Sequence, residues 1–598
     1  MLRKPAPEIE APPIDLFTMV VIRRRFEAII REMINALFKS GRSGVLNTAM
    51  DFSCSLTDHQ FRSISLAQGL PVHVGAIDLI PKAVAAKFGK DIRPGDCFVN
   101  NSGYLGNTHC ADFTVCAPVF FEGRVVFYVI ARAHLGDMGF PTPTTYSPTA
   151  KDVYEEGLIL PCVRIQKDYA DVPEVIDICR ANIRVPDQFY GDYLAVLAAV
   201  RTGENRLVEL CGKYGSFKIE AFLEEFQKYA ERMAVDAIRK LPAGAVSKEM
   251  LYDSEYKGLP DGIPIRATLT VDPEDATVTV DLTDNVDNLP LGINLTESTV
   301  TAACMTAVLN ILGPDVPRCT GSFKRVHLLL RDGSAIGRPK FPAATSAATT
   351  NLCHALVPHI QSMFAELRSD LGTAYGTIGM PGSCAVISGL DHRTSQPFVN
   401  QIIMGYWGGP AMHGHDGWLT YGSGCSQGIL WQSSVEVVEQ QQPILIEKLE
   451  IRQDSGGAGE WQGAPGAECS IKARQNPVRF IVNSASRQNP PQGAAGGLAA
   501  APMRIARMGT DGAVEELPIS VDTVIASGER LLSHGCGGGG FGDPLRRMAD
   551  LVSRDVREGV ISAERARDVF GVILKDGEVD QSATLERRQE LEDRRGAS

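Results

Sequence analysis

Two apolar runs joined by a short turn place the strongest constraint on the fold of this chain. The stretch "DFTVCAPVFFEGRVVFYVIARAHLGD" from Asp112 predicts strands over 113–121 and 124–131, with a turn at Glu122-Gly123. A His-x-x-Asp pattern lies at each end, as His109 to Asp112 and as His134 to Asp137. Because antiparallel pairing brings the two ends of a hairpin together, we expect both patterns to lie side by side.

This juxtaposition points to a divalent metal site. Imidazole and carboxylate groups are usual ligands of zinc, manganese and iron(II). His109 and Asp112, three residues apart, can reach one point from a turn or a helical face, and His134 arrives from the far end of the hairpin. A fourth ligand could be Asp137, or Asp51 in "MDFSCS". The alternative is that both histidines are structural, with the aspartates as their hydrogen-bonding partners.

The length of 598 residues is too great for one hydrophobic core, so we expect several domains. The patterning indicates an α+β, multidomain protein with mixed sheets, flanking helices and a β-rich C-terminal domain. The expected parts are an N-terminal helical arm (1–48), a metal-bearing α/β domain (49–240), a central mixed α/β domain (241–440), a β-rich, Gly-rich domain (441–544) and a C-terminal helical tail (545–598).

Several elements follow from local patterns. Apolar residues at helical spacing predict a helix over 14–38, ended by Gly41 and Gly44. The runs "IRATLTVDPEDATVTVDLTD" and "STVTAACMTAVLNIL" predict, respectively, two strands around the turn 272–275 and a helix. Two short helices are expected around Gly559, with Ser562 as an N-cap, and the charged tail 585–598 is expected to fray.

Composition narrows the classes of partner and compartment. A formal net charge of -12 without a long basic run disfavours nucleic acid and anionic membrane surfaces. The N-terminus lacks the apolar run of a signal peptide, and no stretch approaches the ~20 apolar residues of a membrane span. Fourteen cysteines without any C-x-x-C pair indicate reduced, buried thiols. We therefore expect a cytoplasmic protein.

At these motifs the chain resembles the hydantoinase B type subunits, which include N-methylhydantoinase B, the corresponding half of 5-oxoprolinase, a caprolactamase subunit, and subunits of acetone and acetophenone carboxylases. The matching phrases run in family order over about residues 14–575: "DFSCSLTD" from Asp51, "GLPVHVGA" from Gly69, "GYLGNTHCADFTV" from Gly103, "ARAHLGDMG" from Ala131, "YEEGLILP" from Tyr154, "NIRVPDQFYGDY" from Asn182 and "CGGGGFGDPLRR" from Cys536.

The resemblance implies a zinc or manganese ion bound by Asp51, His109, Asp112 and His134. It thereby favours Asp51 over Asp137 as the fourth ligand, with Asp137 behind the ligands or facing substrate. It also implies a hydantoinase A-type partner that uses ATP to phosphorylate the substrate, and self-association within a larger complex. The sequence agrees with the assignment of ATP to the partner, because it contains no G-x-x-x-x-G-K-[ST] phosphate loop.

This chain departs from the usual family residues at Asn101–Tyr104, Gly106-Asn107 and Ala49-Met50. None of these positions is one of the four expected ligands. We expect the differences to alter the lining of the pocket, and therefore the choice of substrate.

Two activities follow from the resemblance. The first is hydrolysis of a cyclic amide (a hydantoin, oxoproline or lactam) after its carbonyl oxygen is phosphorylated. The alternative is ATP-dependent carboxylation of a ketone such as acetone or acetophenone. A third possibility is a scaffold with a structural metal. As acid or base we expect one of His73, Asp137, Glu155 and Glu156.

Overall fold

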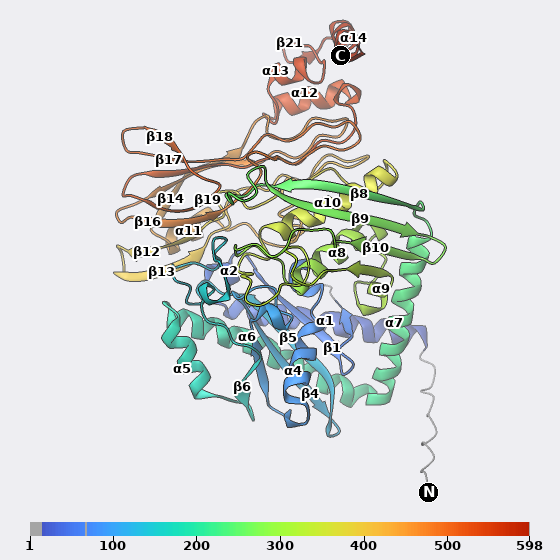
Figure 1. Cartoon of the computed structure of the whole chain (residues 1–598), viewed down its shortest axis with the longest axis vertical. Helices are drawn as coiled ribbons and strands as arrows, with labels where there is room; N and C mark the ends of the chain where they lie inside the picture. The colour runs from blue at the N-terminus through green and yellow to red at the C-terminus, as the bar shows by residue number, and fades with distance from the viewer. Residues whose placement is uncertain (1–14, 66–68, 597–598) are drawn as a thin grey trace.

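A computed structural model describes residues 15–65 and 69–596 (Figure 1). Residues 1–14 of the expected helical arm, 66–68, and 597–598 of the tail lie outside the described residues. The architecture is α+β and multidomain, as the patterning predicts, with layers stacked along the long axis (Figure 1). The domain boundaries stay a prediction.

The expected hairpin forms the middle of a seven-stranded sheet in the order β2-β1-β5-β4-β3-β6-β7. Strands β4 and β5 pair antiparallel with Asp112 opposite His134, which confirms the predicted hairpin. Strand β1 pairs antiparallel with the other edge of β5, with Phe52 opposite Ala133. The strands are β1 (Phe52–Asp58), β2 (Ser63–Ser65), β3 (Cys97–Asn100), β4 (Asp112–Phe121), β5 (Arg124–His134), β6 (Val163–Lys167) and β7 (Ala170–Asp171).

Helices cover both faces of this sheet. On one face, α1 buries Phe26 against Phe127 of β5 and Phe222 of α7, with ring centroids 5.7 and 5.6 Å apart. On the other face, Phe88 of α4 packs on Phe98 of β3 at 4.5 Å. The helices of this part are α1 (Leu16–Ser40), α2 (Gly44–Asn47), α3 (Pro71–Val74), α4 (Leu79–Phe88), α5 (Pro173–Asn182), α6 (Pro186–Tyr214) and α7 (Ser216–Ile238), with short 3-10 turns η1 (Gly89–Asp91), η2 (Gly103–Leu105) and η3 (Val153–Glu155).

A second layer combines a four-stranded sheet, in the order β11-β10-β9-β8, with buried helices α8 and α10. Strands β9 and β10 pair with Asp272 opposite Thr277, so the predicted turn is confirmed. Helix α8 also contacts α3 of the first layer: at Gly75, a Cβ would lie 2.5 Å from the Ala302 Cα. The elements are β8 (Gly244–Tyr252), β9 (Ile263–Asp272), β10 (Thr277–Asp281), β11 (Val326–Leu329), α8 (Glu297–Leu312), α9 (Thr320–Phe323) and α10 (Leu352–Leu367).

Two further sheets share one apolar core and form a β-rich part. Their orders are β13-β12-β16-β19 and β14-β15-β20-β17-β18. Gly-rich segments around 409, 457, 463, 497 and 538–540 pass so close together that a Cβ at Gly538 would collide with the backbone of Gly409. The elements are β12 (Val386–Asp391), β13 (Gln396–Gln401), α11 (Val435–Gln441), β14 (Ile444–Ile451), β15 (Ala467–Ala473), β16 (Val478–Asn483), β17 (Arg504–Met508), β18 (Val514–Glu516), β19 (Ser520–Ile525) and β20 (Arg530–His534).

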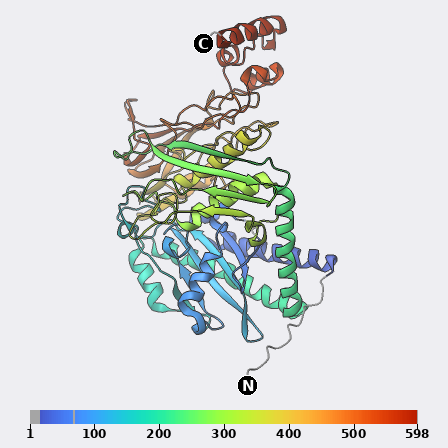
Figure 2. The ribbon, with the colours of Figure 1, turned by 45° about the vertical axis from the view of Figure 1, so that its right-hand side comes forward.

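The C-terminal helices project from the end opposite the seven-stranded sheet (Figure 2). Ser562 caps α13 by accepting a hydrogen bond from the Arg565 N–H at 3.1 Å, as predicted. The prediction of a frayed tail is wrong: it forms α14, which Arg588 ties down by donating to the Phe570 carbonyl at 3.1 Å. The elements are η4 (Pro544–Arg546), α12 (Ala549–Arg557), α13 (Ala563–Asp568), β21 (Leu574–Lys575), β22 (Glu578–Val579) and α14 (Gln581–Gly596).

Two bulk expectations can be compared with the fold. All fourteen cysteines are buried free thiols, as predicted. Within 15–65 and 69–596, no helix is both long and apolar enough to cross a membrane.

Candidate metal centre

Three predicted ligands converge where the hairpin opens. Asp112 is the first residue of β4 and His134 is the last of β5, so the strand pairing places them opposite each other. The Asp112 Oδ1 atom lies 3.1 Å from both His109 Nε2 and His134 Nδ1, and these two nitrogens are 3.2 Å apart. All three side chains are buried, with 0%, 0% and 4% of His109, Asp112 and His134 exposed.

The contacts of His109 show why this cluster fits a metal. Its Nδ1 lies 2.7 Å from the backbone carbonyl of Ser346, which can only accept, so Nδ1 carries the proton and Nε2 offers a lone pair. That lone pair faces the Asp112 carboxylate oxygen, also an acceptor, and a cation must lie between them. Ligand atoms around a tetrahedral zinc ion stand about 3.3 Å apart, close to the separations seen here. The donor set therefore fits a divalent metal.

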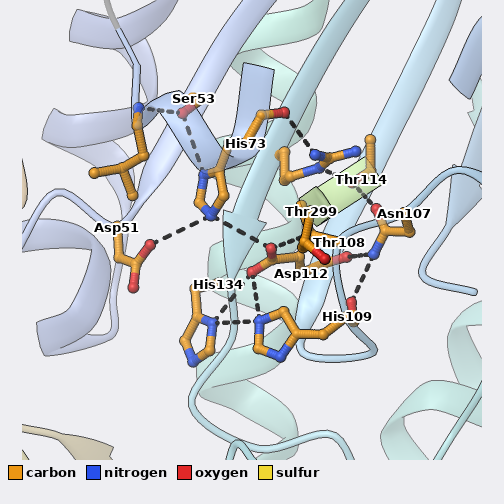
Figure 3. A network of polar contacts seen from close by, with 12 residues as sticks. Asp51, Ser53, His73, Asn107, Thr108, His109, Asp112, Thr114, His134 and Thr299 are labelled. Carbon is orange, nitrogen blue, oxygen red and sulfur yellow. Dashed lines mark hydrogen bonds and ion pairs between the residues drawn. The ribbon is translucent and has the colours of Figure 1, made fainter. Parts of the chain in front are cut away.

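Asp51 and His73 extend the cluster on one side, with His73 between two carboxylates (Figure 3). His73 Nε2 lies 3.3 Å from Asp112 Oδ2 and 3.6 Å from Asp51 Oδ1. Ser53 Oγ accepts from the Leu70 N–H at 2.9 Å and lies 3.2 Å from His73 Nδ1, so its hydroxyl proton can point at that nitrogen. This arrangement favours a proton on His73 Nε2, which faces the Asp112 carboxylate at the shorter of the two distances. Asp51 itself stands beside the cluster because its carbonyl accepts from the His134 N–H at 3.0 Å.

A buried polar chain holds the loop that carries His109 and Asp112. Asn107 donates to the backbone carbonyls of His109 and Asp112 at 2.7 and 2.8 Å. Thr114 donates to Asn107 Oδ1 at 2.7 Å and accepts from Arg132 Nε at 2.9 Å. Arg132 also donates to the His73 carbonyl at 2.6 Å, so one guanidinium links the strands, the loop and α3.

Charge inside the cluster shifts the pKa of its members. Burial opposes the charged form of His109, but the Asp112 carboxylate outweighs it and raises the His109 pKa. Burial likewise opposes the Asp112 carboxylate, whose pKa is nevertheless well below its ordinary value because of His109 and His73. Burial lowers the pKa of Arg132 to about 10. The cluster therefore attracts a cation, whether a proton or a metal.

The second His-x-x-Asp pattern is divided between two environments. His134 joins the cluster, while the fully buried Asp137 carboxylate accepts from the Arg184 backbone N–H at 2.7 Å, the Arg184 guanidinium at 3.0 Å and the Gly139 N–H at 3.0 Å. These contacts anchor the loop after β5 to the segment before α6.

Glu155 and Glu156, adjacent in sequence, also differ. Glu155 is partly exposed and accepts from the Lys151 N–H at 2.9 Å. Glu156 is buried behind His109, where it accepts from the Thr345 N–H beside Ser346. Burial raises the pKa of Glu156 to about 8.

A small cavity of about 50 Å³ opens beside the cluster. Asp51, His73 and His134 belong to its lining. The second and β-rich layers supply further lining residues, which include His354 of α10, Gln401 of β13 and Trp407. Sequence reasoning did not identify these three residues, because they follow no motif and lie hundreds of residues from the hairpin. Trp407 stands in the Gly-rich loop "MGYWGGP", and that loop composition is the one local signal.

Known proteins are similar to this chain over nearly its whole length. The caprolactamase subunit beta of Pseudomonas jessenii is 29% identical over 579 residues, covering 96% of this chain and 98% of that protein. The crystal structure of the ATP-dependent caprolactamase from Pseudomonas jessenii superposes with a TM-score of 0.88 at 28% identity, covering 96% of this chain and 100% of the other. A nucleotide-free acetone carboxylase structure has a TM-score of 0.87 at 17% identity, over 97% and 83% of the two chains, which shows a shared fold.

The family model described as hydantoinase B/oxoprolinase matches residues 15–544, most of the chain. This chain therefore belongs to the hydantoinase B/oxoprolinase family.

Proposed function

We propose that this chain is the metal-binding subunit of an ATP-dependent hydrolase that opens a cyclic amide, such as a hydantoin, an oxoproline or a lactam. The observation that carries the proposal is the buried triad of His109, Asp112 and His134, in which His109 Nε2 and an Asp112 carboxylate oxygen lie 3.1 Å apart. Similarity over the full length to a caprolactamase subunit supports a cyclic amide as the substrate.

The proposed ligands are Asp51, His109, Asp112 and His134, with zinc or manganese as the ion. A divalent ion held there supplies a Lewis acid that lowers the pKa of a coordinated water and polarises an oxygen of the substrate. Asp112 and His109 are fixed by the Asn107 hydrogen bonds, and His73 Nε2 lies 3.3 Å from the Asp112 carboxylate.

Of the four side chains expected to act as acid or base, His73 is the one that lines the cavity. Its Nε2 stands between Asp51 and Asp112, where it can hold a proton against either carboxylate. Asp137 is paired with Arg184, Glu155 faces outward, and Glu156 lies behind His109. We therefore assign proton transfer to His73 in this proposal.

Activation by ATP is assigned to a partner subunit of the hydantoinase A type, which would phosphorylate the amide carbonyl oxygen. The absence of a G-x-x-x-x-G-K-[ST] motif from the sequence supports this division. The activated ring would then reach the cavity beside Asp51, where water adds to the former carbonyl carbon and the ring C–N bond breaks as the nitrogen takes up a proton and leaves as an amine. Hydrolysis of the resulting acyl phosphate would release inorganic phosphate and the ring-opened carboxylate.

The test is a substrate-dependent assay of the chain co-expressed with its A-type partner. ADP and ring-opened product are measured with ε-caprolactam, hydantoin and 5-oxoproline, and carboxylated product with acetone or acetophenone plus bicarbonate. We expect ATP-dependent opening of at least one amide ring, and an Asp112→Asn complex that loses ring opening by more than about 100-fold. Asp96→Asn is the matched control, since Asp96 is equally buried but pairs with Arg164 at 3.3 Å, away from the cluster.

Two results would contradict the proposal. Full ring opening by the Asp112→Asn complex would exclude a catalytic metal at this cluster. Turnover of ketone and bicarbonate with no ring opening of any amide would replace the hydrolase by the carboxylase.

A further inference from the structure

We propose that a second cavity, lined by residues of α1, α7 and α8, binds a small organic phosphate, with the apolar part of the ligand against the cavity walls and its phosphate against Arg23 and Arg318. The phosphorylated ring of the proposed function belongs to this class, so the inference rests on that function for the natural ligand. It adds a binding site outside the metal cluster and the residues that hold a ligand there.

This second cavity is the larger of the two that adjoin α3. Its volume is about 270 Å³, against about 50 Å³ for the cavity beside the metal cluster. Small-molecule sites in proteins commonly enclose about 300–1,000 Å³. The larger cavity comes close to this range, so its size suits a small ring that carries a phosphate group.

The walls of the larger cavity are mostly apolar. They include Met305 and Leu309 of α8, Phe226 of α7 and Val316, each of which is at most 7% exposed. Ile429 also lines the cavity and is 38% exposed, so its side chain still offers apolar surface to a ligand. Burial of the apolar part of a ligand against such walls is favourable in proportion to the area removed from water.

The charged residues of this lining carry an excess of positive charge. They are Arg23, Glu27 and Arg318. Glu27 is 8% exposed and contacts three guanidiniums, those of Arg23 at 3.1 Å, Arg24 at 2.7 Å and Arg31 at 3.8 Å. Because one carboxylate cannot neutralise three cations, the excess exists even before Arg318 is counted. It attracts an anionic ligand.

Arg318 has N–H groups available for that anion. Among the residues that the structure describes, it makes one hydrogen bond, from Nη2 to Asn310 Oδ1 at 2.8 Å, and no ion pair. A guanidinium presents five N–H donors in a planar fork, which matches the oxygens of a phosphate. The Arg23 guanidinium lies 5.9 Å from the ring centroid of Phe226, so one cation of the lining stands over an apolar wall. This combination fits an anion with an apolar body.

The two cavities lie on opposite faces of α3. Pro71 and Val74 line the larger cavity, whereas Val72 and His73 line the one beside the metal cluster. Successive residues of a helix are about 100° apart around its axis, so these two pairs of residues face opposite directions. One short helix therefore separates a ligand in the larger cavity from His73 and the metal cluster. This proximity supports the phosphorylated ring as the natural ligand.

The test measures binding of three probes to the zinc-loaded full chain by calorimetry: phenyl phosphate, inorganic phosphate and benzoate. Phenyl phosphate should bind more tightly than the other two. Arg318→Gln should raise the Kd of phenyl phosphate and of inorganic phosphate about tenfold, the effect of one lost charged hydrogen bond. Ile429→Ser should raise the Kd of phenyl phosphate about three- to tenfold and leave that of inorganic phosphate unchanged.

The control variant is Arg507→Gln, which should leave all three Kd values unchanged because Arg507 pairs with Glu515 in the β-rich part. Arg318 and Ile429 are both exposed, so their replacement should not impair folding. If Arg318→Gln nevertheless does not fold, the contrast between phenyl phosphate and inorganic phosphate in Ile429→Ser decides alone.

Three results would overturn the site. They are a wild-type chain that does not bind phenyl phosphate, one that binds benzoate equally tightly, and a Kd of phenyl phosphate that is unchanged in either variant, as expected of a probe held by the metal ion. These measurements need neither ATP nor the partner subunit. Their failure would therefore leave the proposed function to its own test, ring opening by the Asp112→Asn complex.

Discussion

Asp51 and Asp137 provide a matched pair of substitutions, because both aspartates flank the hairpin and only one is a proposed ligand. We expect Asp51→Asn to lose metal and keep stability, and Asp137→Asn to keep metal and lose stability. The two effects come from different contacts of the two carboxylates.

The cost of Asp137→Asn follows from its three hydrogen bonds. Gly139 and the Arg184 guanidinium both donate to Oδ1. If the amide oxygen of the introduced asparagine occupies the Oδ1 position, it still accepts both hydrogen bonds, which are weaker because the oxygen no longer carries a charge. In the wild-type chain the Arg184 backbone N–H donates to Asp137 Oδ2 at 2.7 Å. The NH₂ group of the introduced asparagine would replace Oδ2, cannot accept this bond, and would leave the Arg184 N–H unsatisfied. An unsatisfied buried donor costs about 1–3 kcal/mol. Since Arg184 is partly exposed, the lost ion pair adds little.

Asp51→Asn should affect metal affinity instead. Its side-chain contact with His73 is 3.6 Å long, beyond hydrogen-bond distance, and its backbone bond to His134 does not depend on the side chain. Stability should therefore change by less than about 0.5 kcal/mol. Loss of a residue behind the ligands typically reduces metal affinity about 10–100-fold, and loss of a ligand should exceed this.

The assay is zinc titration against a competing chelator, combined with thermal unfolding of the metal-free chain. For Asp137→Asn the unfolding midpoint of the seven-stranded unit should fall by roughly 2–4 °C per kcal/mol. Zinc affinity that is unchanged in Asp51→Asn and reduced in Asp137→Asn would refute the geometry. Asp137, and not Asp51, would then be the fourth ligand.

Three further predictions concern pH and packing. The folded-state pKa of Glu156, about 8, lies above its ordinary value of 4.5, so the stability that its bound proton confers is complete below pH 4.5 and lost as pH rises through 8. The free energy of unfolding of Glu156→Gln should therefore exceed that of wild type at pH 9 by up to a few kcal/mol, and should not exceed it at pH 4. The raised His109 pKa means that the metal displaces a proton, so zinc affinity should fall about tenfold per pH unit below that pKa and flatten above it, and a pH-independent affinity would contradict this. Gly538→Ala should destabilise the β-rich part by about 3 kcal/mol or more because its Cβ meets the Gly409 backbone. The control is Gly512→Ala, which has open space around its Cβ and should cost only the backbone strain of its φ of 84°.

Local features of the sequence were enough to predict the hairpin and the convergence of His109, Asp112 and His134. Two apolar runs and the Glu122-Gly123 turn define both strands, and strand register then brings their ends together. The position of Asp51 depends on the pairing of β1 with β5, a contact between distant segments that no local pattern encodes. The residues alone left Asp51 and Asp137 as alternatives, and the family resemblance favoured Asp51.

The rest of the cavity lining could not be predicted for the same reason. His354, Gln401 and Trp407 come from a helix, a strand end and a loop, and only the packing of three layers brings them to the cavity beside the cluster. Glu156 has the local sequence of an exposed turn, yet the 345–346 segment covers it. Helix α14 forms because Arg588 and its neighbours find tertiary partners, which composition alone does not reveal.

The central claim, that this cluster holds a metal required for ring opening, is tested most directly by metal removal and return. The co-expressed complex is stripped with a chelator, dialysed, and assayed for ATP-dependent opening of ε-caprolactam, hydantoin and 5-oxoproline before and after addition of zinc or manganese. We predict that stripping abolishes ring opening and that one of the two ions restores it in wild type but not in Asp112→Asn. Undiminished ring opening by a complex shown to be metal-free would contradict the account.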